Sequence, residues 1–136
     1  MDNLLEFHWW YILIAVIIFA IVKRGKGGVV TKRYEAKLVA VEPSFQGCKT
    51  EATYAVFKEG RPDHINIEID NLPIAAGEEV ELLMDGQRFA RVKVNRRSSI
   101  DFDHWSDETT SFPVVSGGED LCVRFQGSDL FKGTFS

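Results

Sequence analysis

From residue 34 onward, apolar and polar side chains alternate along short runs, a period of two that is typical of β-strands with one buried face. Turn-forming residues separate the runs, and Asp85-Gly86 between two of them is a strong hairpin signal. The expected strands cover 53–58, 64–70, 79–85, 90–95, 100–103, 121–125 and 130–135. The pattern predicts an all-β domain of about seven or eight strands, most simply an antiparallel β-sandwich, with a small barrel as the alternative.

The N-terminal part of the chain has a different pattern, because apolar residues follow one another without alternation. Leu4 to Val22 is a stretch of 19 residues, and its strictly apolar part runs from Trp9 to Val22. A helix of that length spans about 28 Å, close to the roughly 30 Å hydrocarbon core of a membrane. A cleaved signal peptide would need basic residues before the apolar run and small residues after it. We therefore expect a transmembrane α-helix.

Residues on either side of the apolar run predict how the helix lies in the membrane. Trp9, Trp10 and Tyr11 form an aromatic belt for one interface, and Lys23, Arg24 and Lys26 mark the other. Positive charge lies only after the helix, so the N-terminus is expected outside and the β domain in the cytoplasm. We predict a single-pass protein of the cell (inner) membrane, with the tail and helix at 1–22, a basic linker at 23–33 and a β domain at 34–136.

Charge is distributed unevenly along the chain. Residues 1–33 carry five basic and two acidic side chains, whereas residues 34–136 carry 11 basic and 18 acidic side chains. So acidic a domain is repelled by the phosphates of nucleic acids, which excludes that class of partner. The same repulsion acts at anionic lipid headgroups, to which the basic linker is attracted.

Candidate metal ligands are concentrated in one acidic segment of the β domain. Asp101 and Asp103 share one face of a predicted strand, and Asp107 follows in the next loop. Carboxylates at this density are suited to Ca²⁺ or Mg²⁺, but the spacing is not that of an EF-hand. The simpler interpretation is an acidic, solvated strand face that continues into a loop. The spacings required for zinc are absent.

The sequence contains no motif for nucleophilic catalysis and no phosphate-binding glycine pattern, so we predict that the chain is not an enzyme. His8, among the aromatic residues of the helix end, is the one anchor residue able to ligate the metal of a tetrapyrrole ring. Its simpler interpretation is an interfacial polar residue, and we expect no cofactor. Cys48 and Cys122 have opposite parities on their strands, which disfavours a disulfide between them.

With catalysis and cofactor binding not expected, the function left for the surface of the β domain is to dock on a partner. The candidate residues are Arg91, Lys93, Arg96, Arg97 and Trp105. Cross-strand pairing with Glu79 and Glu81 also explains Arg91 and Lys93 without any function. An anchor, a well-patterned domain and no catalytic motif together favour an accessory or assembly subunit that docks on other integral membrane proteins. The alternative is a membrane-tethered module that binds a ligand, glycan or peptide through the loops 59–63, 104–112 and 126–129.

Overall fold

A computed structural model describes residues 29–136, which form nine strands and one short 3-10 helix. The predicted anchor at 4–22, His8, the interfacial residues Trp9, Trp10, Tyr11, Lys23, Arg24 and Lys26, and most of the basic linker lie outside this range. Among the residues from 29 to 136, no helix is long and apolar enough to cross a membrane.

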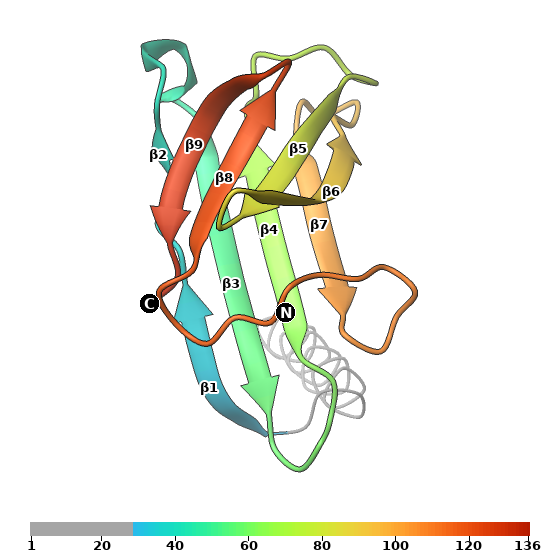
Figure 1. The fold of residues 1–136 in the computed structure, drawn as a ribbon. Coiled ribbons are helices and arrows are strands. Elements are labelled where there is room, and N and C mark those ends of the chain that lie inside the picture. The colour runs from blue at the N-terminus through green and yellow to red at the C-terminus, as the bar shows by residue number, and fades with distance from the viewer. Residues whose placement is uncertain (1–28) are drawn as a thin grey trace, which may run out of the picture.

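The described part is all-β and consists of two antiparallel sheets in a sandwich-like arrangement (Figure 1). One sheet has four strands in the order β1-β3-β4-β7, and the other has five in the order β2-β9-β8-β5-β6. The elements are β1 (Val30–Glu35), β2 (Val39–Ala40), η1 (Pro43–Phe45), β3 (Lys49–Phe57), β4 (His64–Asp70), β5 (Glu79–Met84), β6 (Gln87–Lys93), β7 (Ile100–Trp105), β8 (Asp120–Phe125) and β9 (Ser128–Thr134).

The predicted alternation places one face of most strands in a single core between the sheets. Ile65, Ile67 and Ile69 of β4 are fully buried, whereas the intervening side chains of the same strand are half-buried. Val80 and Leu82 of β5 and Val123 of β8 meet them from the other sheet as part of the same buried cluster. Burial of one face on each sheet is what an antiparallel sandwich needs.

The predicted strands 79–85 and 90–95, and likewise 121–125 and 130–135, correspond to hairpins, each closed by a two-residue turn. Asp85 and Gly86 have φ of 50° and 81° and join β5 to β6, while Gln126 and Gly127, with the same two values, join β8 to β9. Positive φ at both central residues is the type I′ pattern, whose twist matches that of paired strands. The prediction for these hairpins is therefore confirmed.

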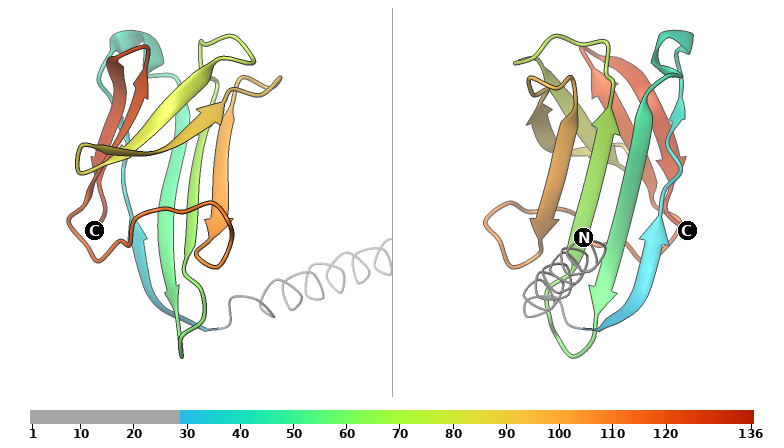
Figure 2. Two further views of the ribbon diagram at one scale, coloured as in Figure 1. Left: turned by 45° about the vertical axis from the view of Figure 1, so that its right-hand side comes forward. Right: turned by 180° about the vertical axis from the view of Figure 1, so that it is seen from behind.

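Differences from the predicted elements are concentrated at the start of the domain. β1 begins at Val30, inside the segment predicted as linker, and pairs with β3 from Val30↔Phe57 to Glu35↔Thr53. The chain then crosses to the other sheet, where β2 pairs with β9 (Figure 2). The sequence pattern did not predict β2 as a separate strand, because two residues are too few to show an alternation of apolar and polar side chains.

Candidate functional site

Sequence-predicted docking residues are not brought together by the fold. Trp105 ends β7 of the four-stranded sheet, whereas Arg91 and Lys93 lie on β6 of the five-stranded sheet. Arg96 and Arg97 are exposed in the turn between β6 and β7, where Asn95 Oδ1 accepts a hydrogen bond from the Arg97 amide at 2.9 Å. Trp105 therefore lies on a different sheet from Arg91 and Lys93, while Arg96 and Arg97 lie in the turn between the two sheets.

The basic residues of β6 face carboxylates across the hairpin, as predicted. Lys93 lies opposite Glu79 and Arg91 opposite Glu81, and Arg88 Nη1 is 3.3 Å from Glu81 Oε2. Opposite charges on facing positions stabilise a sheet by about 0.2–1 kcal/mol per pair. These side chains are thus accounted for by the hairpin itself.

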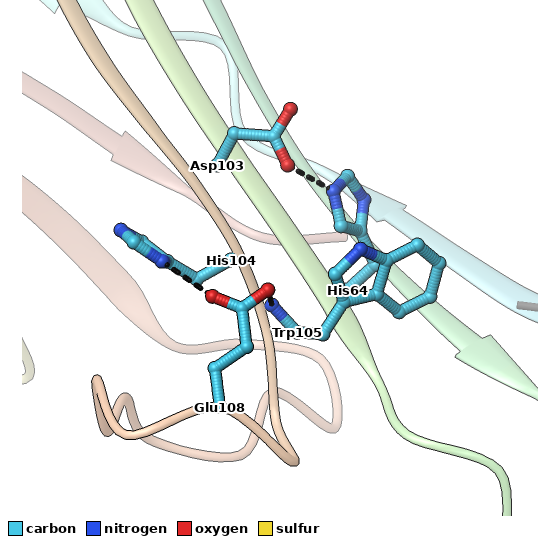
Figure 3. A network of polar contacts seen from close by, with 5 residues as sticks. All are labelled: His64, Asp103, His104, Trp105 and Glu108. Carbon is cyan, nitrogen blue, oxygen red and sulfur yellow. Dashed lines mark hydrogen bonds and ion pairs between the residues drawn. The ribbon is translucent and has the colours of Figure 1, made fainter. Parts of the chain in front are cut away.

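A group of polar and aromatic contacts surrounds Trp105 (Figure 3). We call it the His–Trp cluster, and its members are His64, Asp103, His104, Trp105 and Glu108. It forms because β4 and β7 are antiparallel neighbours in which His64 is the direct partner of Trp105. The two rings lie on the same face of the sheet, with centroids 4.5 Å apart.

On that face the imidazole of His64 is also bonded to a carboxylate. His64 Nε2 contacts Asp103 Oδ1, and Asp103 stands two pairs further along the ladder, on the same side of β7 as Trp105. The side chain of His64 is 23% exposed and that of Asp103 is 43% exposed. His64 is the first residue of β4, and its ring lies against that of Trp105.

His104 and Glu108 secure the loop that follows β7. His104 alternates with Trp105, and its ring meets that of Phe102 with centroids 4.6 Å apart. Glu108 Oε2 lies 2.9 Å from His104 Nδ1, while Glu108 Oε1 accepts a hydrogen bond of 3.2 Å from the Trp105 backbone amide. The Glu108 carboxylate therefore holds the His104 side chain and the Trp105 backbone at the end of β7.

A second set of hydrogen bonds joins this loop to the β3–β4 hairpin. The amide of Asp63 donates to Ser106 Oγ, and the amide of Ser106 donates to the Asp63 carbonyl, both at 2.8 Å. The Tyr54 hydroxyl, which belongs to a fully buried side chain, donates to Asp63 Oδ2. Burial, followed by the hydrogen bond to Asp63 and its charge, raises the pKa of Tyr54. The loops at this end are thus fixed in place.

Phe57 extends the aromatic surface toward the start of the described chain. Its ring lies 5.4 Å from that of Trp105, and its backbone pairs with Val30 of β1. Val29 and Val30 are 68% and 48% exposed. Apolar and aromatic side chains therefore gather at the end of the sheet where the chain enters from residue 28.

Beyond the aromatic residues, the same face of the sheet becomes acidic. Glu51, Glu68 and Asp101 are direct cross-strand partners on β3, β4 and β7. We call these three residues the carboxylate row. Burial, followed by the charge of Asp101 and of the other acidic neighbours, raises the pKa of Glu68.

These carboxylates do not assemble a metal site. Asp101 and Asp103 share the outer face of β7 as predicted, but Asp103 is engaged by His64, and Asp107 lies in the following turn. Among residues 29–136, no group of three or more His, Cys, Asp or Glu side chains is arranged to hold a metal ion. The metal candidates Asp101, Asp103 and Asp107 therefore have no geometric support.

Both cysteines are free thiols. Cys48 packs against the core and its Sγ donates to the Asn71 carbonyl at 3.3 Å, while Cys122 lies opposite Lys132 on the polar side of β8. Burial, together with a hydrogen bond to Asp129, raises the pKa of Cys122 to about 11. A thiol with so high a pKa is a poor nucleophile at neutral pH.

The His–Trp cluster combines aromatic and charged side chains at one end of the four-stranded sheet. It presents aromatic area and charged hydrogen-bonding groups, and the hydroxyl of its neighbour Ser106 is already engaged with the hairpin backbone. Sequence reasoning found Trp105 but not Phe57 or the pairing of His64. The sequence could have indicated that His64 and Trp105 share a face of the sheet only if the pairing of β4 with β7 had been known. No model of a known protein family matches the chain, and no curated protein sequence matches it.

Proposed function

We propose that this chain is a non-enzymatic single-pass membrane protein whose β domain is an accessory or assembly subunit of a larger membrane complex. Residues 4–22 would anchor it, with the N-terminus outside and the β domain in the cytoplasm. The apolar length of the anchor and the positive charges that follow it support this topology.

The main support for a docking role is the position of the aromatic surface that Phe57, His64 and Trp105 form. Phe57, His64 and Trp105 form contiguous, half-buried rings beside Val30, where the described chain begins. In a protein anchored by residues 4–22, this end lies nearest the membrane, so a neighbouring membrane protein meets it first. Aromatic residues are enriched at the energetic centres of protein interfaces.

The acidic balance of the domain favours a protein partner over lipid for this surface. Asp103 is bonded to His64 within the cluster, and the carboxylate row continues on the same face. Anionic headgroups repel such a face, whereas a protein can present complementary charges. Nucleic acid is disfavoured for the same electrostatic reason.

A second candidate function is a membrane-tethered module for a ligand, glycan or peptide. Its support is the direct bonding of the 59–63 and 104–112 loops through Asp63 and Ser106. The 126–129 turn lies at the opposite end of the domain (Figure 1), so only the first two loops would form such a site.

The deciding experiment is gentle detergent extraction from the native membrane, followed by native-size analysis and identification of co-purifying subunits. We expect a complex larger than the monomer, and we expect Trp105→Ala to lose its partners because the aromatic surface is interrupted. Val39→Ala is the matched control, since Val39 is 67% exposed but lies on the other sheet.

Migration of the wild-type chain as a lone monomer would contradict the accessory role. Retention of all partners by Trp105→Ala and by Phe57→Ala would contradict the docking surface. Thermal unfolding of each variant separates loss of binding from loss of folding. A glycan or peptide that shifts Trp105 fluorescence in the isolated protein would favour the second function.

A further inference from the structure

The carboxylate row is an unfavourable arrangement for an isolated sheet. Glu68 stands directly opposite Glu51 on one side and Asp101 on the other, so three negative charges lie side by side across three strands. Like charges at directly facing positions destabilise a sheet. The hairpin of the other sheet avoids this, because Glu79 and Glu81 face Lys93 and Arg91.

Positive charges available on this face are placed at its margins. Lys49 lies opposite Asp70 at one end of the β3–β4 ladder, and Arg33 Nη2 is 3.7 Å from Glu35 on β1. The central residues between them are acidic or neutral. Nothing in the described β3–β4–β7 registers puts a basic residue opposite a member of the row.

Hydrogen-bond acceptors are therefore in excess at the centre of the face. Asn66 lies between His64 and Glu68 on β4, and its side-chain Oδ1 is buried with no hydrogen-bond partner among the described residues. A guanidinium or ammonium group brings several N–H donors and no acceptor. A cationic partner supplies what this face lacks in both charge and donors.

The aromatic end of the face is suited to the same kind of partner. Trp105 and Phe57 offer ring surface next to the carboxylates, and a cation placed over an aromatic face is attracted to it. Arginine combines a planar charge that stacks on rings with a fork of donors that matches carboxylates. The aromatic surface and the carboxylate row are distinct features that favour the same ligand chemistry.

We propose that the outer face of β3, β4 and β7 binds a Lys/Arg-rich segment of a partner membrane protein, with the carboxylate row and Trp105 as its principal contacts. The inference rests on the proposed function, because it is the cytoplasmic segments flanking membrane spans that carry an excess of lysine and arginine. A domain held at that surface meets such segments at high local concentration.

The test measures binding of a fluorescently labelled peptide of alternating arginine and serine to the full chain in nanodiscs of neutral lipid. A peptide with glutamate in place of arginine is the ligand control. The test variant is Glu68→Gln with Asp101→Asn, and the matched control is Glu79→Gln with Glu81→Gln. Both variants change the net charge equally, but only the first alters the carboxylate row.

We expect the arginine peptide to bind and the glutamate peptide not to bind. The Glu68/Asp101 variant should lose affinity by about tenfold, and the Glu79/Glu81 variant should stay close to wild type. Affinity should fall with added salt, since the contacts are between exposed charges. Equal affinity of both variants, or no binding by the wild type, overturns the proposal.

Two further outcomes assign the face to a different occupant and also overturn the proposal. One is binding confined to a peptide that copies residues 23–33 of this chain. The other is binding of anionic vesicles that the Glu68/Asp101 variant abolishes. The proposed function fails in a different experiment. If it is wrong, the full chain extracted from its native membrane has no co-purifying subunits, regardless of the result of the peptide-binding measurement.

Discussion

Gly133 illustrates at the residue scale how the crossing between sheets constrains the sequence. A Cβ added at Gly133 would lie 2.5 Å from the carbonyl oxygen of Lys37, in the segment that connects β1 to β2. That neighbour is backbone and has little freedom to move away. The absence of a side chain at this position is thus what allows β9 and the crossing segment to approach.

We expect Gly133→Ala to destabilise the domain by about 1–3 kcal/mol, the usual range for overpacking at a close contact. Gly47→Ala is the control, because nothing lies within 4 Å of the Cβ it would add. Urea unfolding of both variants measures the difference. Equal midpoints for the two would show that the Lys37 segment yields to the added methyl group.

At the scale of elements, the β5–β6 hairpin and the neighbouring strands β3, β4 and β7 show opposite arrangements of charge. The β5–β6 ladder alternates acid against base, whereas the β3–β4–β7 ladders place acid against acid in the carboxylate row. This part of the four-stranded sheet is therefore less stable than its hydrophobic pattern alone implies. A basic segment bound to this face would relieve the repulsion.

Neutralising the centre of the row should stabilise the isolated protein. We expect Glu68→Gln to raise the free energy of unfolding by about 0.2–1 kcal/mol near pH 7. The folded state raises the pKa of Glu68 above its ordinary value of 4.5, so folding disfavours the ionised carboxyl. The destabilisation is therefore fully present above the raised pKa and is lost as the pH falls through it.

Chemical unfolding at neutral pH and at about pH 4 checks both parts of this expectation. The variant and the wild type should differ at neutral pH and should converge in acid, where Glu68 is protonated in both states of the wild type. A variant less stable than wild type at neutral pH would show that Glu68 makes a net favourable contact.

For the molecule as a whole, stability comes from the core that the two sheets share. The buried cluster includes side chains from both sheets, and Ala36 and Phe135 bridge them where β1 leaves the four-stranded sheet. No disulfide joins the two cysteines, and the described residues contain no metal-binding group.

The melting temperature of the purified chain should accordingly be unchanged by a reducing agent or by a chelator. The thiols should also react slowly with alkylating reagents at neutral pH, and Cys122 should react faster as the pH rises toward its pKa of about 11. A fall in melting temperature with the chelator would reveal a metal at Asp101, Asp103 and Asp107 after all.

The sequence predicted the features that depend on neighbouring residues. The burial of Ile65, Ile67 and Ile69 and the turn at Asp85-Gly86 follow from local alternation and turn chemistry, and both are confirmed. The His–Trp cluster and the carboxylate row depend on which strands pair and in what register. That information arises from the packing of the whole chain, so no local pattern could predict it.

The pairing of β1 also has a mechanical consequence. β1 begins at Val30, bonds along β3, and is extended by a hydrogen bond from the Lys58 amide to the Val29 carbonyl at 3.0 Å. A pulling force that enters at Val29 and is resisted at the far end of the domain acts parallel to this strand. It therefore loads the hydrogen bonds of the ladder together in shear and does not open them one at a time. In an anchored chain, β1 would therefore transmit tension from the anchor into the four-stranded sheet.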